Sequence, residues 1–356
     1  MSRVYFYLPR CNSISTPLSE FVVRWNEYAK SLKKIGVTGS SVTLLMDDSV
    51  PENTWGDVSI VRLRKNRIIQ FFQLAIRFKR KNGKATLIAG NNYDALMSVI
   101  FLRKLNPKLK VQASLHVEID AIRASAGLKA IFKKYLLKKL IPMVDSLRLV
   151  RAQEIIKAQE FLGVAREQIV VCPIPITIPE DPIGPRGQGI GYLGRIHAER
   201  SPFFWSEVAL AVSELEPTSL FFVAGSGPDE RDMRSLLSPL GSNVKFLGFI
   251  TGSELKDFWL SIKVLLVTAP FESYGMAARE ALLHGVMIVA PRLDTYLEIE
   301  QIAPSLVKLY LNKNEAVSHV LSGVNVDLKS EEVAKFREFF RASQDEQMKS
   351  LAYSWL

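Results

Sequence analysis

Short apolar runs alternate with longer amphipathic stretches along the whole chain, and this alternation limits the possible folds more than any other feature. Runs bounded by turn residues are typical of buried strands, and the stretches between them are long enough for helices. Strands that alternate with helices form a parallel sheet covered on both faces. The expected strands are 4–9, 41–46, 58–63, 85–90, 111–116, 146–150 and 169–174, followed by 190–194, 220–225, 244–249, 264–269, 286–290 and 306–310.

A segment rich in proline and glycine, TIPEDPIGPRGQG at 177–189, separates the two series of strands and is typical of a linker. A chain of 356 residues is also long enough for two domains of ordinary size. We therefore predict an α/β protein with an N-terminal Rossmann-like domain over 1–177, a linker over 178–189 and a C-terminal Rossmann-like domain over 190–356. The two domains are expected to face each other across a cleft, with ligands beyond the carboxyl ends of the strands.

The stretch FESYGMAAREALLHG, residues 271–285, follows one expected strand and carries two glutamates on either side of a glycine. A helix N-terminus exposes unpaired N–H groups, and the missing side chain at Gly275 lets an anion approach them closely. The carboxylate of Glu280, about a turn and a half into the helix, suits the diol of a ribose, and Glu272 is expected to face a sugar beyond the phosphates. The amides expected to hold the phosphate belong to Ser273, Tyr274, Gly275 and Met276.

A second strand ends at Gly194 in the stretch YLGRIHAER, residues 192–200, and two arginines follow it. The guanidinium groups of Arg195 and Arg200 suit a diphosphate, which such groups bind bidentately. Together with the helix N-terminus they could neutralise a diphosphate without a metal ion. The sequence holds no D-x-D motif, so we expect neither a divalent cation nor a cofactor at this site.

Four sequence elements together resemble the family 4 retaining glycosyltransferases of the two-Rossmann-domain (GT-B) type, also described as glycosyl transferases group 1. The family pattern E-G-F-G-x-x-x-x-E-A-x-A-x-G-x-P-V-V is matched by ESYGMAAREALLHGVMIV at 272–289. Its G-R-L-x-x-E-K element is similar to GRIHAER at 194–200, its G-x-G-P element to FFVAGSGP at 221–228, and its F-L-G strand to FLGFI at 246–250. Order and spacing agree, and the resemblance covers roughly 189–290.

The resemblance implies transfer of a sugar from a nucleotide-sugar donor, UDP or GDP, to a glycan acceptor that is lipid-linked, as in the synthesis of bacterial surface polysaccharides. It implies that Arg195 and Arg200 hold the diphosphate and stabilise the leaving charge. Glu272 would then contact the donor sugar, and His116, after a strand of the first domain, would contact the sugar or the acceptor. The residues that the resemblance assigns to the donor are Gly194, Ser273, Tyr274, Gly275, Met276, Glu280 and, near the nucleobase, Ile250 with Phe249 beside it.

Departures from the family pattern keep other interpretations open. Ser273 stands where the family has glycine, Met287 where it has proline, and YLPRCNSISTP at 7–17 where it has a glycine-rich loop. The chain ends YSWL, so we expect the final helix that crosses back to the first domain to be missing or very short. The alternatives are a non-catalytic scaffold with this fold, a nucleotide-sugar epimerase and a trehalose-type synthase.

Charge is divided unevenly between the two halves. Residues 1–180 contain 29 Lys and Arg against 14 Asp and Glu, whereas 181–356 contain 17 against 22. Segments 64–84 and 127–141 mix lysine and arginine with large apolar residues. They could be helices packed on the sheet with solvated basic faces, or they could bind an anionic membrane surface at roughly 1 kcal/mol per basic residue. Nucleic acid is a weaker alternative because no recognition motif accompanies the charge.

Two cysteines, Cys11 and Cys172, give neither a metal-ligand spacing nor a disulfide framework, which favours a reducing compartment. We find no signal-peptide pattern and no apolar run of 18 residues. The sequence therefore predicts a cytoplasmic protein that is peripheral on the inner face of the cytoplasmic membrane.

Overall fold

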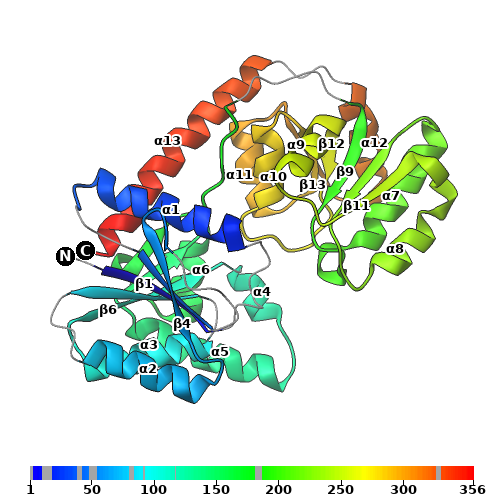
Figure 1. Cartoon of the computed structure of the whole chain (residues 1–356). Coiled ribbons are helices and arrows are strands. Elements are labelled where there is room, and N and C mark those ends of the chain that lie inside the picture. The colour runs from blue at the N-terminus through cyan, green and yellow to red at the C-terminus, as the bar shows by residue number, and fades with distance from the viewer. Residues whose placement is uncertain are drawn as a thin grey trace. The chain divides into compact units, whose positions relative to one another are not determined.

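The computed structural model describes residues 3–9, 18–37, 42–47, 54–79, 84–90, 93–116, 118–180, 187–325 and 330–356. The chain divides into two compact units, Met1–Pro175 with Ala342–Leu356, and Ile176–Arg341 (Figure 1). Each unit contains its own sheet and its own hydrophobic core, so each is described separately.

The first unit is built on a sheet of eight strands in the order β3-β4-β2-β1-β5-β6-β7-β8. All neighbours are parallel except β3, which pairs antiparallel with β4. The strands are β1 Arg3–Leu8, β2 Val42–Asp47, β3 Thr54–Trp55, β4 Val58–Leu63, β5 Ala85–Ala89, β6 Leu109–Leu115, β7 Ser146–Leu149 and β8 Ile169–Val171. The central strands are buried on both faces, as a parallel sheet requires.

Helices cover both faces of this sheet. Tyr5 and Tyr7 point into a core shared with α2, α3, α5 and α6, whereas Val4 and Phe6 point into a core shared with α1 and the end of α13. The helices of this unit are α1 Leu18–Lys34, α2 Arg67–Lys79, α3 Tyr93–Leu105, α4 Ile119–Ala124, α5 Leu128–Leu140 and α6 Glu154–Leu162, with short 3₁₀ turns η2 Ile141–Met143 and η3 Arg166–Gln168.

The second unit is a fully parallel six-stranded sheet in the order β11-β10-β9-β12-β13-β14. Its strands are β9 Gly189–Leu193, β10 Phe221–Ala224, β11 Val244–Gly248, β12 Ile262–Leu266, β13 Met287–Pro291 and β14 Val307–Tyr310. Its helices are η4 Ala198–Arg200, α7 Pro202–Leu215, α8 Glu230–Leu236, η5 Ser238–Asn243, α9 Gly252–Ser261, α10 Met276–Leu283, α11 Asp294–Ile302 and α12 Lys313–Asn325. The unit's strands lie in the order third, second, first, fourth, fifth, sixth, which is the Rossmann order.

The prediction of two Rossmann-like domains is confirmed. Every strand expected from the sequence is present, with ends that differ by at most three residues. The two-residue strand β3 was not predicted, because a run that short carries no periodicity. Among the described residues, no helix has both the length and the apolar character of a membrane span. Part of the loop expected in place of the glycine-rich loop lies outside the described residues.

The expectation that the chain lacks a helix crossing back to the first unit is wrong, because such a helix leads into the YSWL element rather than following it. Helix α13, Ser330–Ser354, is 25 residues long and carries the chain from the second unit back into the first. Met348, Leu351 and Trp355 are buried in the core that α1 covers, and the Trp355 indole N–H donates to Gln112 Oε1 at 2.9 Å. Residues 342–356 therefore belong to the first unit, whereas the sequence placed them in the second domain.

Candidate functional site

Most of the predicted donor residues follow two neighbouring strands of the second unit, where the order of strands reverses. Strands β9 and β12 are neighbours, but the chain continues from β9 toward β10 and β11 on one side and from β12 toward β13 and β14 on the other. The loops that follow these two strands therefore diverge, and in Rossmann sheets a ligand binds at this switch point. The loop after β9 carries Arg195 and Arg200, and the loop after β12 carries Glu272 and Gly275.

A small pocket opens between these loops. It is lined by the ends of β9 and β12, by the first turn of α10 and by Arg200, Thr268, Glu272 and Tyr296. Tyr296 is buried, and burial together with the carboxylate of Glu272 raises the pKa of its hydroxyl well above the ordinary value. One cation, one carboxylate and two tyrosines, Tyr192 and Tyr296, therefore line the pocket.

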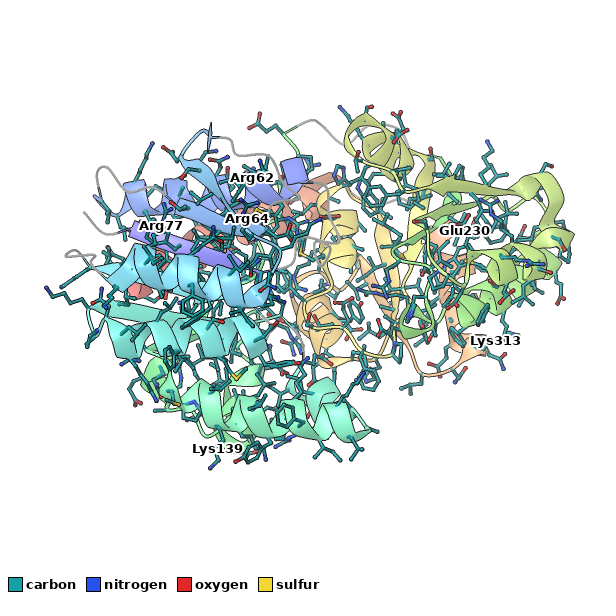
Figure 2. The ribbon with its side chains drawn as sticks, turned by 60° about the horizontal axis from the view of Figure 1, so that its bottom comes forward. Arg62, Arg64, Arg77, Lys139, Glu230 and Lys313 are labelled. Carbon is teal, nitrogen blue, oxygen red and sulfur yellow. The ribbon has the colours of Figure 1, made fainter. Side chains whose placement is uncertain are left out.

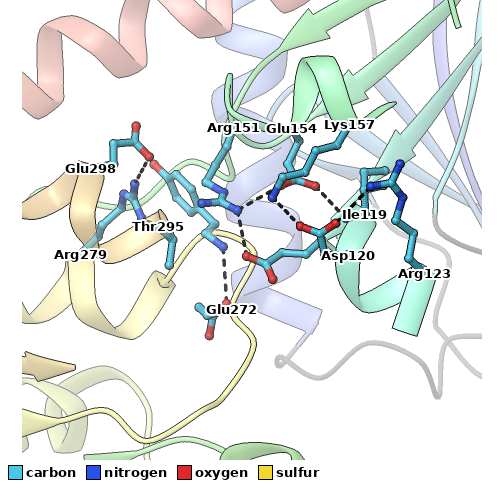
Figure 3. A network of polar contacts seen from close by, with 12 residues as sticks. Ile119, Asp120, Arg123, Arg151, Glu154, Lys157, Glu272, Arg279, Thr295 and Glu298 are labelled. Atoms are coloured by element: carbon cyan, nitrogen blue, oxygen red, sulfur yellow. Dashed lines mark hydrogen bonds and ion pairs between the residues drawn. The ribbon is translucent and has the colours of Figure 1, made fainter. Parts of the chain in front are cut away.

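Arg200 and Glu272 form an ion pair across the switch point (Figure 3). The Thr268 hydroxyl donates to the backbone oxygen of Arg200 at 2.8 Å, so the two loops are joined by backbone as well as side-chain contacts. Partial burial would lower the pKa of Arg200, but the carboxylate of Glu272 outweighs it, and the pKa is raised above its usual value. Arg200 is thus a fixed cation whose charge is balanced by Glu272.

The turn before α10 has the geometry that the sequence predicted. Gly275 has φ 69° and ψ 50°, in the left-handed region that favours glycine, and it precedes the first residue of the helix, Met276. A Cβ at Gly275 would lie 3.1 Å from the Tyr296 ring, so a side chain would be crowded as well as strained. Ser273 and Met276 are half-buried, and Tyr274 is buried. The turn therefore brings backbone N–H groups to the edge of the pocket.

Arg279 packs against Tyr274 of this turn and so stabilises it. The sequence did not suggest this role. The Arg279 guanidinium lies 3.9 Å from the centre of the Tyr274 ring, donates to Thr295 Oγ1 at 3.5 Å and lies 3.4 Å from Glu298 Oε2 (Figure 3). The side chain is buried. An arginine inside the apolar run of α10 was the available signal, since a buried arginine needs partners.

The loop after β9 lies against the loop after β10, backbone to backbone. Gly194 N–H donates to Ala224 O at 3.0 Å and Ile196 N–H to Ser226 O at 3.0 Å. A Cβ at Gly225 would lie 1.8 Å from Gly194 O, and one at Gly227 would lie 2.0 Å from Ile196 O. The glycines of the G-S-G-P element therefore let the two loops touch.

Arg195 emerges from this contact into solvent. Its side chain is 60% exposed, and its closest acidic partner is Glu199, with Arg195 Nη2 3.8 Å from Glu199 Oε2. The Tyr192 hydroxyl donates to the Arg195 backbone oxygen at 2.8 Å, which fixes where the side chain begins. The backbone of Arg195 is thus held by a hydrogen bond, while its guanidinium is exposed to solvent.

The remaining donor candidates lie around the same edge of the sheet. Glu280 is half-buried on α10, and its backbone oxygen accepts from His284 N–H at 3.0 Å. Ile250 is half-buried after β11, with Phe249 exposed beside it. Strand β11 is two strands from β9, so these two residues lie farther from the switch point than Arg195.

His116 belongs to the first unit, where it follows β6. Its Nε2 lies 3.1 Å from the Ser114 hydroxyl. Burial, assisted by the cations Arg148 and Arg24, lowers the pKa of His116 to about 3. The imidazole is therefore neutral at physiological pH and can donate one hydrogen bond and accept another.

A cluster of charges follows β6 and β7 in the first unit, and the sequence did not predict it. Arg151 Nη2 lies 2.9 Å from Glu118 Oε1 and 3.4 Å from Glu154 Oε1 (Figure 3). Glu154 Oε2 also accepts the Ile119 backbone N–H at 2.7 Å, at the start of α4. This cluster ties Glu118 and the start of α4 to the residues that follow β7.

No metal site is found in the described parts of the chain: nowhere among them do three or more His, Cys, Asp or Glu side chains converge as an ion would require. Cys172 is a buried free thiol. The expectation that no cation is needed stays a prediction.

Comparison with known sequences finds relatives for the second unit. Residues 187–308, about a third of the chain, match the family model of the glycosyl transferases group 1. An uncharacterized glycosyltransferase of Methanocaldococcus jannaschii is 36% identical over 80 residues, an alignment that spans 22% of this chain and 20% of that protein.

Solved structures resemble the whole chain. The lipopolysaccharide outer core galactosyltransferase WaaB matches with a TM-score of 0.71 and 14% identity over 99% of both chains. Sucrose-phosphate synthase from Thermosynechococcus elongatus matches with a TM-score of 0.73 and 16% identity over 99% of this chain and 98% of its own. HepE from Anabaena in complex with UDP-glucose matches with a TM-score of 0.68 and 12% identity over 98% and 96%. The chain therefore has the GT-B fold of glycosyltransferases.

Proposed function

We propose that this protein is a retaining glycosyltransferase, which moves a hexose from a nucleotide-diphosphate sugar to a glycan acceptor. One observation carries the proposal: the loops at the switch point between β9 and β12 bring two arginines, a carboxylate and a glycine-led helix N-terminus to one edge. This combination suits a diphosphate flanked by hydroxyl-bearing groups.

In the proposed complex, the diphosphate lies on Arg195, Arg200 and the amides at Ser273–Met276. Glu280 accepts hydrogen bonds from the ribose hydroxyls, and Ile250 lies beside the base. The diphosphate competes with Glu272 for Arg200, so binding the donor frees the Glu272 carboxylate to accept hydrogen bonds from the sugar.

Transfer in this proposal breaks the bond between the anomeric carbon and the phosphate oxygen. The acceptor oxygen forms a bond to the same face of that carbon, and its proton passes to the departing phosphate. No enzymic nucleophile is required. Arg195 and Arg200 stabilise the charge that develops on the leaving group, which is the main electrostatic contribution to the rate. His116, neutral by its lowered pKa, orients the sugar or the acceptor rather than acting as a proton carrier.

The comparisons favour parts of this proposal. HepE was solved with UDP-glucose, which favours a UDP-sugar over a GDP-sugar as the donor. WaaB is described as acting on the lipopolysaccharide outer core, which favours a lipid-linked glycan acceptor in bacterial surface polysaccharide synthesis. A cytoplasmic location on the inner face of the membrane would give access to both substrates.

The test is a thermal-shift screen against UDP, GDP, ADP and their common sugar conjugates, with and without EDTA. A ligand at 100 times its dissociation constant adds about 2.7 kcal/mol of stability. We expect one nucleotide family to raise the melting temperature, EDTA to leave that shift unchanged, and Arg195→Ala to reduce it. The absence of any shift would favour the non-catalytic scaffold.

The epimerase and trehalose-type alternatives are separated by their products. With the stabilising nucleotide sugar identified, incubation without acceptor would give a nucleotide sugar with one inverted carbon in the epimerase case, and incubation with a monosaccharide phosphate would give a disaccharide phosphate in the trehalose-type case. A transferase acting on glycans needs an oligosaccharide or lipid-linked acceptor and yields an α- or β-linkage that NMR identifies. Inversion of the anomeric configuration would contradict the retaining assignment.

A further inference from the structure

Three neighbouring helices of the first unit carry apolar stripes on the side away from the sheet. Helices α2, α3 and α5 lie side by side on one face (Figure 2). Each buries an inner stripe, for example Leu74 and Phe78 on α2, and each also exposes an outer one. The outer stripes are Ile68, Ile69, Phe72 and Ile76 on α2, Tyr93, Met97, Phe101 and Leu105 on α3, and Leu128, Ile131, Phe132 and Tyr135 on α5. We call these twelve residues the outer apolar face.

The spacing within each stripe makes the face continuous. Tyr93, Met97, Phe101 and Leu105 follow one another at four-residue intervals, so they lie in one row along α3. Phe71 joins the rows of α2 and α3, because its ring lies 5.3 Å from Phe101 and 6.0 Å from Phe72. Ile76 is 77% exposed and Leu128 is 87% exposed, so the stripes of α2 and α5 are also open to solvent. A contiguous apolar patch of this kind marks an interaction site.

The structure shows which apolar residues of α5 are exposed, which the sequence left open. The apolar residues of α5 could have packed on the sheet, leaving only a solvated basic face. Instead, Leu137 is the fully buried residue of α5, while Leu128, Ile131 and Phe132 are exposed. Helix α5 therefore presents most of its large apolar side chains outward.

Positive charge surrounds the outer apolar face. The three helices carry ten lysines and arginines and one acid. That acid, Asp94, lies 2.7 Å from Arg67. The remaining cations include Arg77, Lys79, Lys104, Lys129, Lys138 and Lys139, all exposed. Figure 2 labels Arg77 and Lys139. The face therefore combines apolar side chains that need cover with a strong excess of positive charge.

We propose that this face docks the protein on an anionic lipid bilayer. Apolar side chains enter the boundary between headgroups and acyl chains, and the surrounding lysines and arginines attract anionic lipid phosphates. A nucleic acid would pair with the cations but offers no apolar surface for Ile76 or Leu128. A second copy of this chain would bring an equally positive face against it, which is unfavourable. Charge and apolarity together fit one partner, and the inference does not depend on sugar transfer.

The experiment is co-sedimentation of the full chain with vesicles of phosphatidylcholine alone and of phosphatidylcholine with 30% phosphatidylglycerol. We expect binding to the anionic vesicles at 0.1 M NaCl and none to the neutral ones. The triple variant Ile76→Ser, Phe101→Ser, Leu128→Ser removes one exposed apolar residue per helix, and we expect at least a tenfold loss of affinity. The matched control Leu215→Ser, Leu311→Ser, Tyr353→Ser changes three exposed apolar residues on other elements and should bind like the wild type.

A second pair of variants tests the charge. Lys129→Gln, Lys138→Gln, Lys139→Gln should weaken binding to anionic vesicles at least tenfold, whereas Lys245→Gln, Lys313→Gln, Lys335→Gln should not. Raising NaCl to 0.5 M should weaken the wild type as well. Circular dichroism and melting temperature verify that each variant is folded, and a double variant without the Phe101 change covers the case in which the triple one is unstable.

Two outcomes would overturn the proposal. One is that the wild type fails to bind anionic vesicles, or binds as strongly after the apolar triple substitution as before it. The other is that sedimentation velocity shows a concentration-dependent dimer that the triple variant abolishes, with no lipid binding, which would make the face a self-association surface. Neither outcome bears on nucleotide binding, so failure here is distinct from failure of the proposed glycosyl transfer.

Discussion

The guanidinium of Arg200 pairs with the carboxylate of Glu272, although the two residues lie 72 positions apart in the chain. The pair joins the loops that follow β9 and β12 and places a cation and an anion in the same small pocket. A diphosphate sugar presents the complementary order of groups, anionic phosphate beside neutral hydroxyls. In the proposed complex, the donor opens this ion pair when it binds.

Replacing Glu272 with Gln should affect binding of the donor's nucleotide and transfer of its sugar differently. Because the carboxylate contacts Arg200 rather than phosphate, we expect the affinity for the free nucleoside diphosphate to stay within about threefold of wild type or to tighten. We expect kcat/KM for transfer to fall at least 100-fold, which corresponds to about 2.7 kcal/mol. Calorimetric titration and a transfer assay measure the two quantities. Glu207→Gln, an exposed change on α7, serves as the control.

Arg195→Ala and Glu280→Ala should each abolish transfer while the fold survives. Arg195 is exposed and its nearest acidic partner is 3.8 Å away, so its loss should change stability by no more than about 0.5 kcal/mol. The loss of a group that stabilises charge in a transition state typically costs 10²–10³ in rate. Full activity in either variant, measured beside the control Arg231→Ala on α8, would contradict the site assignment.

Gly225→Ala should weaken donor binding by moving the loops that follow β9 and β10 apart. The new Cβ would meet Gly194 O at 1.8 Å, so the loops after β9 and β10 must separate, at about 1–3 kcal/mol of stability. Gly241→Ala is the matched control, because Gly241 also has a positive φ but a Cβ there would meet no atom within 4 Å. We expect thermal unfolding and nucleotide affinity to change more for Gly225→Ala, and equal effects would show that backbone strain alone matters.

His116 makes stability depend on pH in a defined direction. Its pKa is about 3 when folded and about 6.5 when unfolded, so between these values the unfolded chain binds the extra proton. The free energy of unfolding should therefore fall as pH drops below 6.5, by up to about 1.4 kcal/mol per pH unit. Denaturant unfolding of the wild type and His116→Gln at pH 7 and pH 5 measures this difference. A wild type no more sensitive to acid than the variant would contradict the pKa shift.

The sequence predicted the sheets well because the strands are short, apolar and bounded by turn residues. The strands also place Arg195 and Arg200 after β9 and Glu272 and Gly275 after β12, and the carboxyl ends of these parallel strands share one edge. That these residues bind a donor stays a prediction. The sequence did not predict that Arg200 and Glu272 pair, because each was assigned to a different part of a ligand. A contact between two loops depends on strand order, which periodicity does not give.

Three further features could not be predicted from the sequence. Helices α2, α3 and α5 each have apolar residues on both sides, and periodicity cannot say which side meets the sheet. Arg279 and Arg151 are buried or paired cations whose partners come from other elements. The final helix was missed because its long outer surface is polar and only Met348, Leu351, Ala352 and Trp355 reach the first core.

The return of α13 also determines the order in which the units can be finished during synthesis. Because residues 342–356 belong to the first unit, the whole second unit, 176–341, interrupts it in the chain. A ribosome delivers the second unit complete while the core beneath α1 still lacks Met348, Leu351 and Trp355. The unit that begins first therefore finishes last, and until then one face of its sheet has apolar surface that a chaperone could recognise.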